Sequence, residues 1–273
     1  MEVPDYLYHY TSVESLALIL KNKTIRLNSM DQMDELQEKE TADIKNFGQF
    51  YYVSSWTDDD VESIPMWSIY TKIDAGVRIK LHANPFLRRN TTVQGLRELG
   101  HQVTHDSGLD SIDTFIPMEE MMKGGYYSVQ GYSGDILRKV IYTDDKSLLY
   151  PTINKSAGGK LLLDTRDIGI YKNTRWAFQK EWRYLMTFLP FRIGDIGTMR
   201  ETFDEMGDKI LSGEEKQPFP YYDLPINDEA YRHMEVMLSP KISAGNRELI
   251  MSVIYRYNPQ IIVSDSSLLG LIR

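Results

Sequence analysis

The chain contains no cysteine among its 273 residues. Metal sites with thiolate ligands, thiol nucleophiles and disulfide-stabilised folds are therefore excluded. It also has no excess of basic charge, because 39 acidic and 31 basic residues give a net charge of −8. A broad sequence-independent nucleic-acid surface needs a stripe of Lys and Arg, so the composition disfavours that class and leaves room only for a local basic groove.

Long apolar runs are absent as well. No stretch approaches the roughly 20 apolar residues that span a bilayer, and the N-terminal segment MEVPDYLYHYTS lacks the basic start and apolar run of a secretory signal. We therefore expect a cytoplasmic protein without a membrane partner.

The residues that are present, 42% hydrophobic and 26% charged, are typical of a globular protein. Their patterns predict one α+β domain over residues 1–273, with polar insertions at roughly 90–135 and 192–228. The strands expected are Leu7–Tyr10, Thr24–Leu27, Phe50–Trp56, Ala75–Leu81, Lys139–Tyr142 and Trp182–Leu189. The helices expected are one capped by Thr11 and Glu14, an acidic one over Met30–Asn46, one opened by Pro65, and one over Ile168–Lys180. A closing βαβ unit is expected over Glu235–Leu238, Ala244–Tyr257 and Ile261–Ser264.

Common catalytic motifs are missing. The sequence has no phosphate-binding P-loop, no G-x-G-x-x-G after a strand and no correctly spaced nucleophile elbow. Of its five histidines, only His9 lies in a recognisable motif. A carboxylate is therefore the expected catalytic group.

Two segments stand out. In Tyr6–Ser12 a histidine, His9, lies within an aromatic strand just before a helix start, where its neutral ring can donate one hydrogen bond and accept another. In Gln179–Tyr184, Glu181 enters a strand of large aromatics, where a rigidly held carboxylate can stabilise a developing cation. Each also has a structural interpretation: a satisfied half-buried histidine, and a surface pair of Glu181 with Arg183 worth less than ~1 kcal/mol.

Several motifs together carry a family resemblance. They are His9-Tyr10-Thr11, Ile25-Arg26-Leu27, Met66-Trp67-Ser68-Ile69-Tyr70, Gly76-Val77, Lys180-Glu181-Trp182-Arg183, and the closing Ser239-Pro240-Lys241 and Ser264-Asp265-Ser266. The set resembles a large family of bacterial domains of unknown function, and the match covers nearly the whole chain apart from the insertions. The architecture is in turn similar to the ADP-ribosyltransferase superfamily, which implies a split mixed sheet flanked by helices.

The superfamily resemblance implies an activity. Enzymes of that kind have a His on a first strand, aromatic residues around nicotinamide and a Glu on a later strand, so the chain is expected to be an NAD-dependent mono-ADP-ribosyltransferase with NAD as ADP-ribose donor and no metal. The chain is also similar to bacterial toxins that modify nucleic acid. This implies a toxin or phage-defence effector, an RNA, DNA or protein acceptor, and an antitoxin or inhibitor protein as partner.

The resemblance assigns the catalytic roles to Glu181 and His9. Cleavage of the nicotinamide bond passes through an oxocarbenium-like ribose, as in glycosidases. Glu181 would hydrogen-bond the ribose 2′-hydroxyl and offset the growing positive charge, and His9 would hold another ribose hydroxyl. The backbone of Tyr10 would bind the carboxamide, and Thr11 belongs to the same motif although its role as helix N-cap already explains it.

The other cofactor-binding residues would be an aromatic pair and two arginines. A ring from Trp67 or Tyr70 could stack on nicotinamide, although a core position explains Trp67 at least as well. Arg26 is the expected partner of the pyrophosphate. Arg183 lies close to Glu181 in sequence, and the pattern does not decide whether the two share a face of the strand.

An acidic cluster supports a second function class. Asp31, Asp34, Glu35 and Glu38 recur at helical spacing and could share one face, which would suit a metal-dependent nuclease or hydrolase. The structural alternative is a solvated helix face. The family pattern here usually has Asn-Asp-Pro followed by an acid, whereas this chain has Met33-Asp34-Glu35-Leu36. A non-catalytic nucleotide-binding module is the third possibility.

Overall fold

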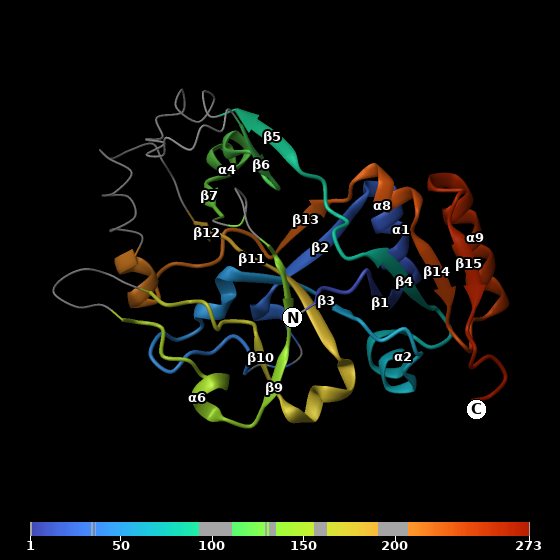
Figure 1. Cartoon of the computed structure of the whole chain (residues 1–273), viewed down its shortest axis with the longest axis horizontal. Coiled ribbons are helices and arrows are strands. Elements are labelled where there is room, and N and C mark those ends of the chain that lie inside the picture. The colour runs from blue at the N-terminus through green and yellow to red at the C-terminus, as the bar shows by residue number, and fades with distance from the viewer. Residues whose placement is uncertain are drawn as a thin grey trace.

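A nine-stranded mixed sheet forms the centre of the protein (Figure 1). The computed structural model describes residues 2–33, 35, 37–92, 111–128, 130, 135–155, 163–190 and 207–272. Seven strands follow the order β13-β2-β3-β1-β4-β14-β15, and β11 and β8 branch from β3. The bounds are β1 Tyr6–Ser12, β2 Thr24–Ser29, β3 Tyr51–Thr57, β4 Gly76–His82, β8 Leu137–Lys139, β11 Glu181–Thr187, β13 Tyr221–Pro225, β14 Glu235–Leu238 and β15 Ile262–Asp265. Within this sheet, β14 and β15 pair in parallel and the other described pairs are antiparallel.

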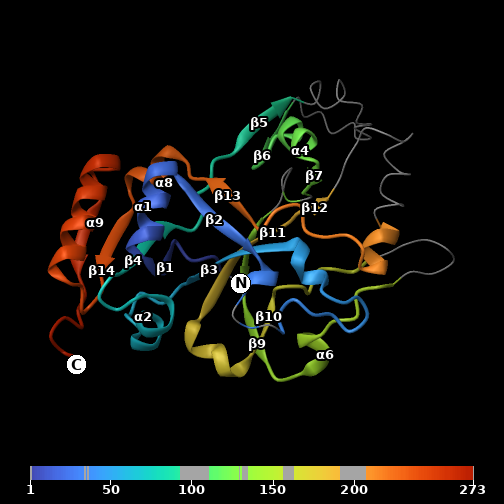
Figure 2. The ribbon, with the colours of Figure 1, turned by 180° about the vertical axis from the view of Figure 1, so that it is seen from behind.

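Helices cover both faces of this sheet (Figures 1 and 2). Residues of α1 Val13–Asn22, α8 Asp228–Arg232 and α9 Ala244–Tyr257 join the main core, and α2 Ile64–Tyr70 packs with Tyr10 on the opposite face of β1. Short elements complete the chain: α4 Met118–Gly124, α6 Lys146–Leu149, and 3-10 turns at Met30–Gln32 (η1), Phe47–Phe50 (η2) and Thr174–Gln179 (η3). Small sheets pair β5 Arg89–Thr92 with β6 Ser111–Thr114, β7 Tyr126–Tyr127 with β12 Leu189–Pro190, and β9 Ile141–Thr143 with β10 Tyr171–Asn173. The α+β class is thus confirmed.

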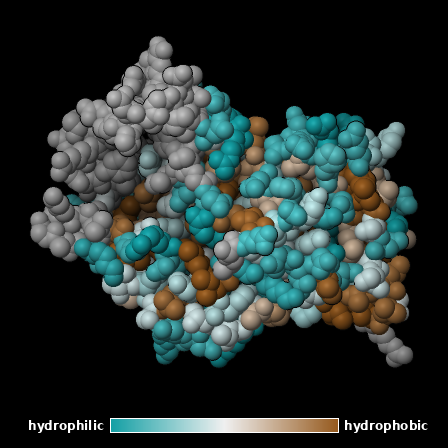
Figure 3. Space-filling model, in the orientation of Figure 1, coloured by the Kyte–Doolittle hydropathy of each residue, from teal (hydrophilic) through white to brown (hydrophobic). Residues whose placement is uncertain are grey.

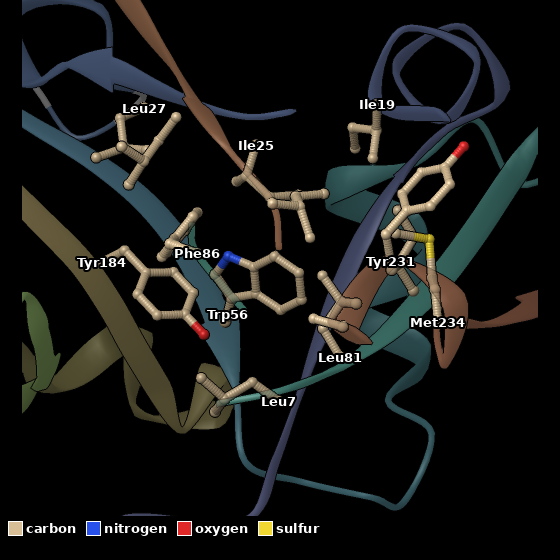
Figure 4. Close-up of a cluster of buried hydrophobic side chains, with 14 of the residues drawn as sticks. Leu7, Ile19, Ile25, Leu27, Trp56, Leu81, Phe86, Tyr184, Tyr231 and Met234 are labelled. Carbon is tan, nitrogen blue, oxygen red and sulfur yellow. The ribbon is translucent and has the colours of Figure 1, made fainter. Parts of the chain in front are cut away.

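The main core follows from strand alternation. Val77, Ile79 and Leu81 are at most 1% exposed, as their period-2 spacing predicts. On β11 the aromatic face packs into the same core, where the Tyr184 ring meets Trp56 and Phe86 edge-on at 5.8 and 4.7 Å between centroids (Figure 4). The opposite face of β11 carries Glu181, Arg183 and Leu185 toward a second, smaller core.

The sheet opens at one edge of β3, because two strands, β1 and β2, share that edge. β11 pairs with β3 along its whole length, from Thr187↔Tyr51 to Glu181↔Thr57, so β1 and β2 must share the other edge. β2 takes its first half, at Ser29↔Tyr52 and Asn28↔Val53, and β1 takes its end, at Tyr8↔Thr57. Between these contacts β3 has no strand partner on that edge among the described strands, and β1 and β2 diverge there.

Three local predictions were wrong. The N-cap of α1 is Ser12 rather than Thr11, because the Ser12 side chain accepts the Ser15 N–H at 3.2 Å. The described residues of the acidic segment Met30–Asn46 form a 3-10 turn, other turns and irregular structure, and Ile168–Lys180 forms β10 and a 3-10 turn instead of a helix. In both segments, described polar and aromatic side chains contact residues far away in the sequence, and do not form the regular contacts between residues three or four positions apart that a helix has.

The second predicted insertion, 192–228, is partly integral to the sheet. Its strand β13 pairs with β2 from Tyr221↔Asn28 to Pro225↔Thr24. The first, 90–135, supplies β6, α4 and β7 among its described residues. Residues 93–110, 129 and 131–134 of the first insertion, residues 192–206 of the second, and Asp34 lie outside the described residues.

On the face drawn in Figure 3, hydrophilic residues cover much of the described surface and the hydrophobic residues form separate areas. Among the described residues, no helix combines the length and apolar character needed to cross a bilayer.

The corrected N-cap gives a stability prediction. Ser12→Ala should lower the free energy of unfolding by about 1 kcal/mol, because the Ser15 N–H loses its acceptor. Thr11→Val keeps the volume of the neighbouring side chain and should leave that bond intact. Urea unfolding of both variants checks this; a larger loss in Thr11→Val would show that the cap is not Ser12.

Candidate functional site

A cleft lies where β1 and β2 diverge from β3. Its volume is about 360 Å³, and α1, β13 and Tyr70 of α2 complete its walls. Five of the predicted cofactor residues line it: His9, Tyr10, Thr11, Arg26 and Tyr70. The sequence motifs therefore meet in space, although they come from β1, β2 and α2.

A second cavity of about 90 Å³ adjoins this cleft through shared residues. His9, Tyr10, Met33, Ser55 and Tyr70 line both spaces. The inner walls are supplied by the residues Tyr8, Glu35, Glu38, Trp56, Met66, Lys172, Trp176, Gln179 and Glu181. Glu181 and His9, the two predicted catalytic residues, thus line the same small cavity.

His9 bridges the gap between the diverging strands. Its Nδ1 lies 2.8 Å from the Ser55 carbonyl oxygen. A carbonyl only accepts, so Nδ1 carries the proton and Nε2 is the acceptor of the neutral ring. The ring also stacks on Trp56 at 4.9 Å between centroids. Burial lowers the pKa of His9 and outweighs the bond to Ser55, which raises it, so the ring is neutral near pH 7.

Glu181 belongs to a buried group of four charges. Its Oε1 accepts from Arg183 Nε at 2.7 Å and its Oε2 from Lys172 Nζ at 3.0 Å. The same two cations pair with Glu38, at 2.7 Å from Arg183 and 3.1 Å from Lys172. All four side chains are at most 6% exposed. Glu181 and Arg183 therefore share a face of β11, and their pair is buried rather than on the surface.

These ion pairs control the protonation of Glu181. Burial raises its pKa, but the charges of Arg183 and Lys172 lower it more, to about 2. The carboxylate is consequently ionised throughout the neutral range.

Glu35 has the opposite shift. Burial, followed by repulsion from Glu38, raises its pKa to about 7, and Lys172 and Arg183 compensate only in part. A hydrogen bond between the Glu35 and Glu38 side chains raises the pKa of Glu35 as well. Gln179, 3% exposed, leaves Oε1 unpartnered while its Nε2 donates to the Tyr70 hydroxyl. Gln179 was missed as a site residue, although it lies two positions before Glu181, and Glu35 was predicted only as a member of the acidic cluster of the metal-dependent alternative.

Three predicted cofactor residues have other contacts here. Trp67 is 0% exposed, meets Tyr10 edge-on at 4.8 Å and donates Nε1 to Glu62, so its ring offers no face for stacking on a ligand. Arg183 is fully buried and lines neither cavity. Arg26 lines the cleft but forms a two-bond pair with Asp223, at 2.8 and 3.0 Å.

The acidic segment does not present one helical face. Asp31 pairs with Lys39 at 2.7 Å, and Glu38 belongs to the buried charge group. Within the described part of the chain, no three His, Asp or Glu side chains are grouped to hold a metal ion.

No family model, curated protein or solved structure matches this chain. The candidate site consequently has to be interpreted from its own geometry.

The buried charge group gives a stability prediction. Arg183→Met would leave Glu38 and Glu181 with only one cation, and removal of a partner from a buried pair typically costs about 3–5 kcal/mol. The matched control is Lys80→Met, which breaks the half-exposed pair with Glu235 and should cost less than about 1 kcal/mol. Chemical unfolding compares the two; equal losses would contradict the assigned role of Arg183.

Glu35 gives a prediction on pH. Its folded pKa of about 7 exceeds the ordinary 4.5, so the stability it contributes is complete below pH 4.5 and declines as the pH rises through 7. Glu35→Gln removes this decline. The melting temperature of the variant should therefore exceed that of the wild type at about pH 8, and the difference should vanish at about pH 4. A constant difference across this range would show that Glu35 does not titrate as described.

Proposed function

We propose that the protein is an NAD-dependent mono-ADP-ribosyltransferase. One observation carries the proposal: His9 of β1 and Glu181 of β11, far apart in sequence, line one small cavity that shares wall residues with a larger cleft. A dinucleotide with a small planar ring at one end suits two adjoining spaces of unequal size.

In this proposal the larger cleft holds the adenosine diphosphate half and the smaller cavity holds nicotinamide. Tyr70 and Trp176 supply aromatic surface beside the ring. Arg26, whose side chain is 39% exposed, binds the pyrophosphate by sharing its guanidinium between the phosphate and Asp223. Tyr10 contributes backbone groups, because its ring is 5% exposed and packs against Trp67.

The charges of the site suit glycosidic cleavage. The bond from ribose C1 to the nicotinamide nitrogen breaks, nicotinamide leaves as a neutral molecule, and the acceptor atom bonds to C1 and releases its proton. Glu181, ionised and held in place by Arg183, stabilises the positive charge that develops on the ribose. Neutral His9 offers Nε2 as acceptor to a ribose hydroxyl, because Ser55 fixes Nδ1 as the donor.

The biological setting belongs to the same proposal. The acceptor is RNA, DNA or protein, and the protein acts in the cytoplasm as a toxin or phage-defence effector with an antitoxin or inhibitor protein as partner. The support for this setting is the sequence resemblance alone.

The test is turnover with NAD labelled in its ADP-ribose part. The wild type should release nicotinamide or transfer label to a macromolecule, and Glu181→Gln should reduce the rate roughly 10²–10³-fold, as loss of one preorganised charged group does. Glu235→Gln is the matched control, because it also removes a strand glutamate paired with a lysine, Lys80, but outside both cavities.

Since Glu181 also stabilises the fold, thermal melting and NAD affinity are measured for each variant. A folded Glu181→Gln protein with an unchanged rate would overturn the assignment of Glu181. NAD binding without turnover in the wild type would favour a nucleotide-binding module, and EDTA-sensitive hydrolysis that needs no NAD would favour the metal-dependent alternative.

A further inference from the structure

The smaller cavity has hydrogen-bond acceptors in its wall, while its Lys172 ammonium is already paired with Glu38 and Glu181. Gln179, 3% exposed, lines it and has a buried Oε1 without a hydrogen-bond partner, and Glu35 lines it with a carboxyl group whose hydrogen-bond partner is another carboxyl group, that of Glu38. His9 adds Nε2, since its Nδ1 donates to Ser55. Buried acceptors without partners are costly, so this set fits a bound group that brings donors or positive charge.

The charges around the cavity also favour a positively charged ligand. Two carboxylates, Glu38 and Glu181, are balanced by Lys172 and Arg183. Glu35 is a third carboxyl group, and Lys172 is the only cation among the described residues that line the cavity. With Glu35 ionised, the group therefore carries one uncompensated negative charge beside the aromatic surface of Trp176 and Tyr70.

We propose that Glu35 is a specificity-determining residue, whose carboxylate makes the smaller cavity select a cationic planar ring over its neutral counterpart. The proposal rests on the proposed function, and there it means selection of the oxidised nicotinamide of NAD, which is positively charged, over the neutral reduced ring. Gln179 Oε1 supplies an acceptor for the carboxamide NH₂ in either form, so the discrimination comes from Glu35.

Proton exchange accompanies this selection. Burial and the nearby Glu38 favour the protonated form of Glu35 near neutral pH, while Lys172 and Arg183 oppose that effect. A bound cation favours the ionised form, so binding releases a proton from Glu35 below about pH 7. Cation binding should then weaken as the pH falls, and binding of a neutral ring should not.

The experiment uses small probes that do not need the larger cleft. Binding of 1-methylnicotinamide, a cation, and of nicotinamide, which is neutral, is measured by tryptophan fluorescence or calorimetry at about pH 8 and about pH 5.5. The wild type should prefer the cation about tenfold at the higher pH, the size of effect expected from one nearby charge in a partly solvated site. The preference should fall at the lower pH. The same comparison is made with NAD and NADH.

Glu35→Gln should remove both the preference and its pH dependence. Glu248→Gln, an equivalent change on an exposed position of α9 outside both cavities, should retain them. Equal affinities for both probes in the wild type, or a preference that persists in Glu35→Gln, would overturn the proposal.

These results are separable from the proposed function. NAD turnover with no effect of Glu35→Gln on selection would leave the transferase assignment intact and reject the role of Glu35. Cation selection that depends on Glu35 in a protein without NAD turnover would support the selective cavity and reject the transferase.

Discussion

The pairing of two strands, β1 and β2, along one edge of β3 determines where the site lies. β11 occupies the opposite edge of β3 completely, so β1 and β2 cannot both continue along the remaining edge. The backbone of β3 between them would be left without partners, which is costly in a buried position. The His9 side chain satisfies the Ser55 carbonyl there. The cleft is thus a consequence of strand pairing, and His9 is both a structural contact and a wall of the site.

The buried charges serve a second requirement, which is to hold Glu181 ionised in a position that burial alone would make neutral. Arg183 and Lys172 achieve this by pairing with both Glu181 and Glu38. Such groups often contribute little to net stability compared with an apolar core of the same volume. Their effect here is on orientation and charge, because each carboxylate is held by two cations from different elements, β10 and β11.

Local patterns in the sequence were sufficient for much of the sheet. Alternation predicted β4, the aromatic face of β11 and the closing strand-helix-strand unit, whose helix Ala244–Tyr257 has the predicted bounds. The same use of periodicity wrongly predicted a helix in the acidic segment Met30–Asn46. Its carboxylates recur at helical spacing, yet the partners of Glu38 are Lys172 and Arg183, more than a hundred positions later. Periodicity contains no information about such distant pairs. β13 was missed for a related reason, because it forms a strand by pairing with β2, which lies far away in the sequence.

The site was predictable in its motifs and not in its detailed contacts. His9 and Glu181 stood out because a histidine and a carboxylate are unusual within aromatic strands, and they do line one cavity. The burial of Trp67 and the pairing of Arg26 with Asp223 depend on elements that the motifs do not include. Gln179 was found only through a buried oxygen that lacks a partner. Glu35 was predicted only as part of an acidic cluster, and its position beside Glu38 in the cavity wall depends on the fold.

The distance in sequence between the parts of the charge group also bears on how the protein folds. β1, α1, β2 and β3 lie within the first 57 residues, whereas Lys172 and Arg183 follow more than a hundred residues later. Contacts between distant segments form slowly, because the loop between them must first be closed. During synthesis on the ribosome, Glu38 therefore cannot pair with Lys172 and Arg183 until β10 and β11 have emerged. The cavity can be completed only after roughly two thirds of the chain has been made, so shorter nascent chains lack the arrangement on which its chemistry depends.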